Sequence, residues 1–243
     1  MTSANKKRAP VDELIEGCKR ILGSGEGSDL KVECDGILWT VHSVLLSIQS
    51  RFFQAACTGN FKENTTRIIQ LHGELPGTVD RMISYLYELN YSDGKVTSTR
   101  HGDSHYISPF DTNVKMYAMG EKFGIDGLKQ LAKEKFEVAF DSVAPTKLGQ
   151  FLDVIPEVYN STPDTDEGLR ELAVTLTLTR EDSRKDLTSL PEFKSTIIQT
   201  PEFALDLILK TVPHVKSGYC HKCKHHVICK ADTSCSECNK WLY

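Results

Sequence analysis

The chain has 243 residues, of which 40% are hydrophobic and 26% are charged, a composition typical of a folded, water-soluble protein. Its 29 basic and 33 acidic residues give a formal net charge of -4, so the chain as a whole lacks the positive field of a dedicated nucleic-acid-binding protein. No run of apolar residues approaches the roughly 20 that a membrane-spanning helix needs. Residues 1–20 also lack the apolar core of a secretory signal peptide, so we expect the protein in the cytoplasm or the nucleus.

Residues 1–25 are expected to form one helix followed by a glycine-rich linker. Apolar residues in the segment 11–22 recur at the spacing of a single helical face, which predicts a short amphipathic helix. These residues are Leu14, Ile15, Cys18 and Leu22. The three glycines of the segment 23–27 end this helix.

Residues 26–140 are expected to form a domain that mixes short strands and helices. Two short strands, Ser28–Cys34 and Ile37–Val41, flank the dipeptide Asp35-Gly36. Because this dipeptide tolerates the positive φ angles of a tight turn, the two strands are predicted to form a hairpin.

Further elements of this domain follow from apolar spacing and from the positions of proline and glycine. We expect helices at 42–48 and 50–57, a strand at 67–71, a helix from Pro76, and helices at 114–123 and 127–140. The segment 92–112 is rich in Ser, Gly, Asp and His without periodicity, so we predict a long surface loop there.

Several short motifs within residues 28–140 together resemble the BTB/POZ domain in their order and spacing. They are Ser28–Val32, Trp39–Ser47, Ser50–Phe53, Gly59–Glu63, Met82–Tyr87 with Tyr91, and Tyr117–Ile125. Two further stretches, Leu89–Tyr91 and Val158–Pro163, are similar to the BTB proteins that filamentous fungi carry in large numbers.

The resemblance implies an α+β fold in which a small sheet is capped by helical hairpins. It also implies a role in protein association, including association of the chain with itself, and no catalytic centre. The family's association surface would include the first helix, with Leu14 and Ile15, and the corner of the hairpin, with Asp29 and His42.

Asp29 and His42 invite two other interpretations. A hydrolase would need Ser43 as nucleophile and His42 as base, but neighbouring residues on a helix point about 100° apart and cannot pair in this way. The simpler interpretation is that Asp29 and His42 order the corner by a mutual hydrogen bond, since partly buried polar groups are normally paired. A direct role at an interface remains the other alternative.

Residues 141–213 are predicted to form a helical extension interrupted by several prolines. Its apolar residues recur at helical spacing, as in Leu148, Phe151, Leu152 and Ile155. Simple packing against the preceding helices is the favoured interpretation. In some BTB proteins such an extension contacts a cullin, so a cullin is the alternative partner that the resemblance implies.

Residues 214–243 contain two C-x2-C pairs, which in a reducing compartment predict a closed zinc site. The four expected ligands are Cys220, Cys223, Cys235 and Cys238. The segment between the pairs is expected to close as a hairpin. Because thirty residues bury too little apolar area to fold alone, one structural zinc ion per chain would supply the missing stability.

Four more donors lie beside these cysteines and leave the ligand set open. They are His221, His225, His226 and Cys229. They could hold a second ion or replace one of the cysteines, although the symmetric four-cysteine site is preferred. The module has five lysines and two acidic residues, a formal +3, which four thiolates and one zinc reduce to about +1. Nucleic acid is therefore a poor candidate partner.

The sequence thus predicts a non-enzymatic interaction protein with a BTB-like domain and a structural zinc module. Two alternatives remain. A cullin-type ubiquitin ligase adaptor would be expected to carry a separate substrate-recognition domain, and none is recognisable. A transcription regulator would use the zinc module to contact DNA, but the charge and the lack of a long recognition helix disfavour it.

Overall fold

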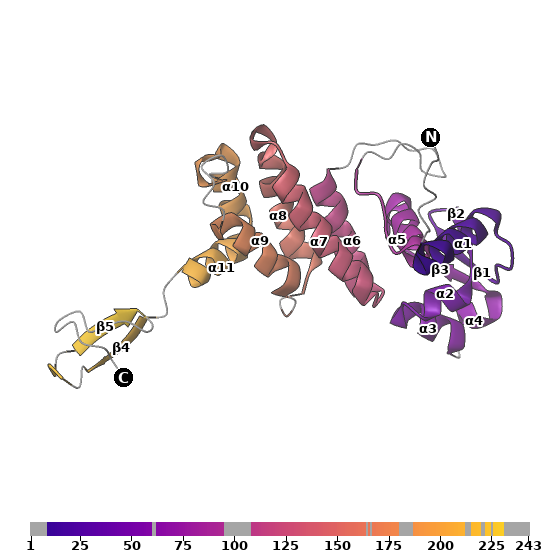
Figure 1. Ribbon diagram of the computed structural model, residues 1–243, viewed down its shortest axis with the longest axis horizontal. Helices are drawn as coiled ribbons and strands as arrows, with labels where there is room; N and C mark the ends of the chain where they lie inside the picture. The colour runs from indigo at the N-terminus through magenta and orange to yellow at the C-terminus, as the bar shows by residue number, and fades with distance from the viewer. Residues whose placement is uncertain are drawn as a thin grey trace, which may run out of the picture.

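The computed structural model describes residues 9–59, 62–94, 108–163, 165, 167–179, 187–211, 215–219, 222–224 and 226–230. The molecule is elongated, with a small sheet and its helices at one end, a row of helices in the middle and a two-stranded hairpin at the other end (Figure 1). None of the helices in these described ranges is long and apolar enough to cross a membrane.

The three-stranded sheet has the order β2-β1-β3. Strand β1 (Leu30–Cys34) pairs antiparallel with β2 (Ile37–Val41) and parallel with β3 (Ile68–Gln70). The turn between β1 and β2 is the predicted Asp35-Gly36, where both residues have positive φ angles of 48° and 77°. Alternate residues of β1 are buried, so one face of the strand contributes to the core.

Among the residues that the structure describes, five helices accompany this sheet. The expected helices at 11–22, 42–48, 50–57 and from Pro76 are confirmed with small shifts of their ends. The five are α1 (Pro10–Ser24), α2 (Ser43–Ser47), α3 (Arg51–Thr58), α4 (Lys62–Thr66) and α5 (Pro76–Glu88). Helix α4 was not predicted. Helix α5 is buried along much of its length and contacts both α1 and α2.

A row of helices forms the middle of the molecule (Figure 1). They are α6 (Pro109–Lys122), α7 (Asp126–Ser142), α8 (Gly149–Ser161), α9 (Glu167–Thr179), α10 (Pro191–Gln199) and α11 (Pro201–Thr211), with short 3-10 turns at Pro145–Lys147 and Leu187–Ser189. The extension packs on the domain through aromatic rings. Phe151 of α8 lies 5.8 Å from Phe110 and 4.8 Å from Phe140, measured between ring centroids. The favoured interpretation of the extension is thereby confirmed.

One boundary differs from the prediction. Helix α6 begins at Pro109, inside the stretch 92–112 that was expected to be a loop. The hydroxyl of Ser108 accepts the backbone N–H of Phe110, and Pro109 occupies the first helical position, where its missing N–H costs nothing. Residues 95–107, the middle of the expected loop, lie outside the described residues.

The hairpin at the far end consists of β4 (Val215–Tyr219) and β5 (His226–Lys230). Its antiparallel register pairs Val215 with Lys230 and Tyr219 with His226. Cys223 of the first C-x2-C pair lies in the turn between the strands, and Cys220 lies outside the described residues. The segment between the two cysteine pairs was expected to close as a hairpin. Its described part, His226–Lys230, pairs with Val215–Tyr219, and residues 231–234 lie outside the described residues.

Candidate functional site

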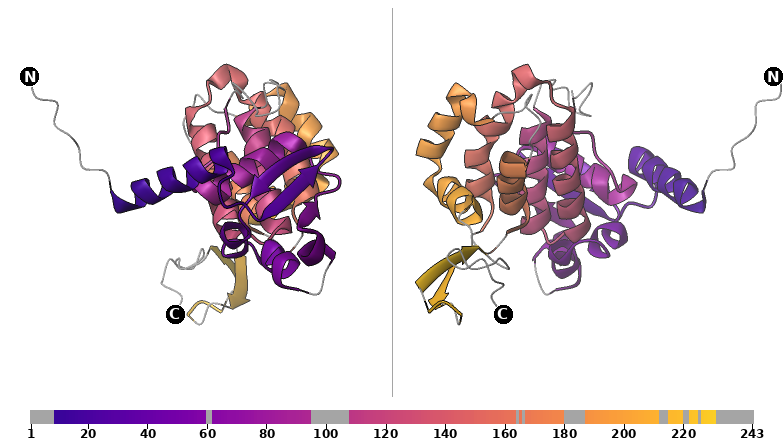
Figure 2. Two further views of the ribbon diagram at one scale, coloured as in Figure 1. Left: turned by 90° about the vertical axis from the view of Figure 1, so that its right-hand side faces the viewer. Right: turned by 60° about the vertical axis from the view of Figure 1, so that its left-hand side comes forward.

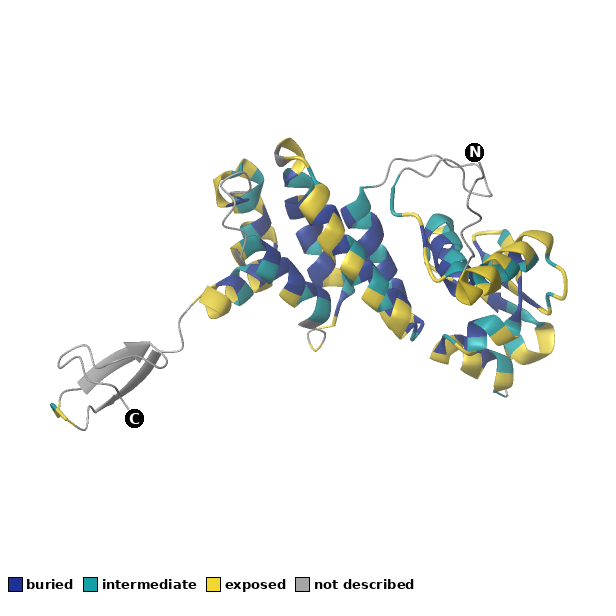
Figure 3. Cartoon of the chain, viewed as in Figure 1, coloured by how far each residue is buried: buried dark blue, intermediate teal, exposed yellow. Residues whose placement is uncertain are grey.

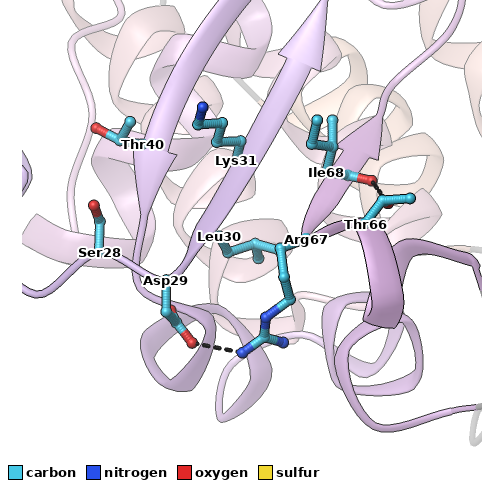
Figure 4. Close-up of a pocket in the computed structure, with 8 residues that line it drawn as sticks. All are labelled: Ser28, Asp29, Leu30, Lys31, Thr40, Thr66, Arg67 and Ile68. Carbon is cyan, nitrogen blue, oxygen red and sulfur yellow. Dashed lines mark hydrogen bonds and ion pairs between the residues drawn. The ribbon is translucent and has the colours of Figure 1, made fainter.

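The corner between β2 and α2 is held by the carboxylate of Asp29, just before β1. One carboxylate oxygen accepts the backbone N–H of Ser43 at 2.8 Å, and the other accepts the Ser43 hydroxyl at 2.6 Å. Arg67, just before β3, donates to the second oxygen at 2.9 Å (Figure 4). Asp29 thus fixes the first turn of α2 and joins it to the start of β3.

His42 is buried on the inner side of the same corner. Its Nδ1 lies 2.7 Å from the hydroxyl of Tyr87 in α5, and its Nε2 lies 2.8 Å from the backbone carbonyl oxygen of Glu26. The backbone N–H of His42 also donates to the Tyr87 hydroxyl, at 2.8 Å. The ring therefore connects α5 to the linker between α1 and β1.

These contacts correct the expected hydrogen bond between Asp29 and His42. Each residue orders the corner, but Asp29 does so through Ser43 and Arg67, and His42 does so through Tyr87 and Glu26. Both ring nitrogens of His42 have other partners, and the Ser43 hydroxyl donates to a carboxylate. The nucleophile–base pair that a hydrolase would need is not formed by these residues.

The electrostatics of the corner favour a charged Asp29. Partial burial by itself raises the pKa of this carboxyl group, but the hydrogen bonds from Ser43 and the charge of Arg67 outweigh it, and the pKa lies below its ordinary value. Both side chains of the Asp29–Arg67 ion pair are 43% exposed, so water screens their attraction.

A shallow hollow of about 260 Å³ opens beside this ion pair (Figure 4). It lies at the ends of all three strands and is lined by Ser28, Asp29, Leu30, Lys31, Thr40, Thr66, Arg67 and Ile68. Asp29 and Arg67 neutralise each other there, and Lys31 adds a further positive charge to the lining.

Helix α1 presents an uncovered apolar face. Leu14 is 68% exposed and Val11 is 60% exposed, whereas Leu22 near the other end of the helix is buried. Two views show the first half of α1 projecting away from the body of the molecule (Figure 2). Lys19 forms an ion pair with Glu88 of α5 at 3.1 Å, which anchors the second half.

A second group of exposed apolar side chains lies on α2 and directly after it. Val44 is 63% exposed and Ile48 is 71% exposed. The side-chain amide of Gln49 donates to the carbonyl oxygen of Leu86 at 2.6 Å and so fixes the end of α2 against α5. Helix α1 is fixed to the same end of α5, through Glu88. Both helices that carry exposed apolar side chains therefore pack against one end of α5.

The predicted zinc ligands fall mostly beyond what the structure describes. Cys220, Cys235, Cys238, His221 and His225 lie outside the described residues, and only the backbone is described for His226 and Cys229. Cys223 lies in the turn of the hairpin, followed by Lys224 with a φ angle of 63°. Among the described residues, no three His, Cys, Asp or Glu side chains gather at one point that could hold a metal ion.

A sequence model of the BTB/POZ domain matches residues 18–140, half of the chain. The chain therefore belongs to the BTB/POZ domain family, and the expected class is confirmed. BTB domains are in general modules through which proteins associate, so the family assigns this chain a role in protein–protein interaction. No curated protein matches the chain significantly.

Proposed function

We propose that the chain associates with itself through a surface formed by α1, the β1–β2 hairpin and α2. The observation that carries the proposal is the projection of α1 with Val11 and Leu14 on its uncovered face. A helix that is apolar on a face turned to water is stabilised when another surface covers that face. Ile15, next to Leu14, is half-buried and extends the same face.

The neighbouring helix supports a continuous surface rather than an isolated helix. Val44 of α2 and Ile48 directly after it are exposed, and α2 and α1 both pack against α5. A two-fold arrangement uses the same patch on both copies, so one such patch is enough for a dimer. Asp29 lies on the surface at the start of β1, whereas buried His42 supports the corner from inside.

Light scattering of the full chain during size-exclusion chromatography tests this proposal. At micromolar concentration we expect twice the monomer mass of 27.2 kDa, because an interface of ordinary size is stable there. The double variant Val11→Glu/Leu14→Glu should run as a monomer. The matched control is Val138→Glu on α7, which replaces a valine of similar exposure away from the proposed surface.

Two results would overturn the proposal. One is a monomer for the natural sequence at tens of micromolar. The other is a dimer that survives the double variant but is lost in Val138→Glu, which would place the interface on α7. Circular dichroism of each variant confirms that the helices are retained.

We further propose that residues 214–243 form a structural zinc module with Cys220, Cys223, Cys235 and Cys238 as ligands. The spacing of the two C-x2-C pairs supports it. A second support is the turn at Cys223 and Lys224, since a left-handed residue after the second cysteine closes a tight loop around the pair. Zinc here would stabilise the module and take no part in a reaction.

An adaptor role with a cullin is the alternative. It would use the region 60–71 and the first part of the helical extension, 145–158. Helix α4 in the first region is exposed, which favours access by a partner. The apolar residues of α8, including Phe151 and Ile155, are buried against other helices of this chain, which leaves mainly polar side chains for such a contact.

A further inference from the structure

Leu89 ends α5 in a left-handed backbone conformation, with φ 51° and ψ 24°. In this region the Cβ atom of an L-residue crowds the backbone, so every residue except glycine costs free energy there. Helices that end in this way use glycine most often, and asparagine is the usual replacement. A leucine at this position therefore strains the backbone of the single chain.

The other non-glycine residues with positive φ in the described part of the chain have polar side chains. They are Asp35, Arg67 and Lys224. Asp35 stands in the two-residue turn of the hairpin, where aspartate is tolerated, and Arg67 binds Asp29. Within this described set, Leu89 is the one apolar residue, and its side chain cannot form a hydrogen bond that would offset the strain.

Packing within this chain offsets only part of the strain at Leu89. Its side chain is 52% exposed, although most of α5 is buried (Figure 3). An apolar side chain contributes to stability in proportion to the area that it removes from water. A surface that covered the exposed part of Leu89 would therefore add the contribution that the single chain lacks.

Leu89 lies at the end of α5 to which both helices of the proposed surface are fixed. The preceding residue, Glu88, pairs with Lys19 of α1 at 3.1 Å. The carbonyl oxygen of Leu86, three residues earlier, accepts the side-chain amide of Gln49 at 2.6 Å. Leu89 thus places an exposed apolar side chain where α1 and the end of α2 meet α5.

Three exposed apolar groups consequently belong to one region of the molecule. They are Val11 and Leu14 on α1, Val44 and Ile48 at α2, and Leu89 after α5. The projecting half of α1 alone presents few side chains, whereas a stable interface of ordinary size buries about 800 Å² on each partner. The end of α5 extends the surface from α1 to α2, and a two-fold arrangement covers it with the same surface of a second copy.

We propose that Leu89 is an anchor of the self-association surface, a residue whose side chain is buried against a second copy of the chain. The inference rests on the self-association proposed above and adds a residue on which the affinity of the dimer depends. A few well-buried side chains dominate the affinity of most interfaces, so a single leucine is sufficient for this role. Contact with the second copy offsets the strain that the single chain carries.

The variant Leu89→Gly tests the anchor role, and sedimentation equilibrium of the full chain measures the dissociation constant of the dimer. We expect this constant to rise about tenfold or more, because each dimer loses two buried side chains. The matched control is Leu75→Gly. Leu75 is 56% exposed, directly precedes the other end of α5 and has an extended backbone with φ -85°. The control should keep the dissociation constant of the natural sequence.

Urea unfolding in a monomeric background separates the anchor role from a structural one. The background is the double variant Val11→Glu/Leu14→Glu, in which the proposed association is lost. There, addition of Leu89→Gly should leave the unfolding midpoint unchanged or raise it, since glycine relieves the backbone strain and only a half-exposed side chain is lost. A residue needed mainly for the packing of α5 would instead lower the midpoint.

The outcomes distinguish this inference from the self-association on which it rests. An unchanged dissociation constant in Leu89→Gly would overturn the anchor role and leave self-association through α1 and α2 standing. A weaker dimer together with a lowered midpoint in the monomeric background would also overturn it, because Leu89 would then act through the fold. If the natural sequence stays monomeric at tens of micromolar, the self-association itself is wrong, and the anchor role with it.

Discussion

The hydroxyl group of Tyr87 contacts His42 at two points, its backbone N–H at 2.8 Å and its Nδ1 at 2.7 Å. On the other side of the ring, Nε2 faces the carbonyl oxygen of Glu26, which can only accept a hydrogen bond. The tautomer with hydrogen on Nε2 satisfies all three contacts, with Tyr87 donating to Nδ1. Through this pair, α5 positions the linker that leads from α1 into the sheet.

Replacement of Tyr87 by phenylalanine should destabilise the domain. The ring remains, but the backbone N–H and Nδ1 of buried His42 both lose their partner, and an unsatisfied buried polar group costs about 1 to 3 kcal/mol. Urea unfolding followed by circular dichroism measures the change. Tyr85→Phe is the matched control, because Tyr85 is equally placed on α5 and makes no side-chain hydrogen bond within the described residues; equal midpoints for the two variants would contradict the prediction.

The Asp29 corner predicts a specific acid sensitivity. Its pKa in the folded chain is lower than the ordinary value of 3.8, since the Ser43 hydrogen bonds and Arg67 outweigh the effect of burial. The charged carboxylate therefore contributes stability above about pH 4, and this contribution is lost as the pH falls through the folded-state pKa. At pH 7, Asp29→Asn should have a lower urea midpoint of unfolding than the natural sequence. The difference between the two midpoints should become smaller below pH 4.

Asp126→Asn provides the control for this pH series. Asp126 pairs with Arg51 at 3.1 Å, but the two side chains are 84% and 78% exposed, and such surface pairs contribute little. Its unfolding midpoint should follow that of the natural sequence at every pH. If the difference in urea midpoint between Asp29→Asn and the natural sequence stays constant from pH 7 to pH 3, the charge of Asp29 does not contribute to stability.

Periodicity explains which elements could be predicted from the sequence. The strands and the helices α1, α2, α3, α5 and α7 carry apolar residues at period 2 or 3.6. Helix α4, with the sequence Lys-Glu-Asn-Thr-Thr, has no buried residue and hence no such signal. The start of α6 was missed because Thr112 and Asn113 are polar and yet buried, and the sequence alone does not show that Asn113 accepts the hydroxyl of Tyr91 at 2.6 Å.

The hydrogen-bond partners of Asp29 and His42 could not be predicted from the sequence, for a different reason. The antiparallel pairing of Leu30 with Val41 places Asp29 and His42 at one end of the hairpin, which made their pairing the natural expectation. The parallel pairing of β1 with β3 brings Arg67 there as well, and the packing of α5 brings Tyr87. Both depend on long-range topology, so only the assembled fold shows that the two residues bond elsewhere.

The close approach of α6 and α7 predicts a sharp intolerance at Gly120. A Cβ atom there would lie 2.7 Å from the backbone nitrogen of Lys129, and backbone atoms inside a helix cannot yield easily. Gly120→Ala should lower the free energy of unfolding by about 1 to 3 kcal/mol, the usual cost of overpacking. Gly17→Ala in α1 is the opposite case, because no atom lies within 4 Å of its Cβ position; it should be neutral or stabilising by up to about 1 kcal/mol.

Unfolding in urea at pH 7 measures both glycine variants under the same conditions. A loss at Gly17 as large as that at Gly120 would mean that the glycine of α1 is needed in the associated state, where another copy approaches the helix. Comparison of the stabilities of Gly120→Ala and Gly17→Ala therefore tests two features: the close packing of α6 on α7, and the open space around Gly17 in α1.

The last prediction concerns metal. The purified chain should carry one zinc, because Cys220, Cys223, Cys235 and Cys238 form two pairs with the two-residue spacing that presents both thiolates to one tetrahedral ion. Structural zinc contributes about 10 to 16 kcal/mol in small modules at neutral pH, far more than the few aromatic residues of 214–243 supply. Removal of zinc by a chelator should therefore unfold this module and leave the domain at 26–140 intact, which hydrogen–deuterium exchange resolves segment by segment.

Replacement of Cys220 and Cys223 by serine tests the ligand set. The zinc content of the double variant should fall from one ion per chain to none. The control Cys229→Ser, which removes a cysteine outside both C-x2-C pairs of the sequence, should keep one zinc ion. Retained stoichiometric zinc in the double variant would place the site elsewhere. Two zinc ions in the natural sequence would bring in Cys229 and the histidines at 221, 225 and 226, because four cysteines can fill only one tetrahedral site.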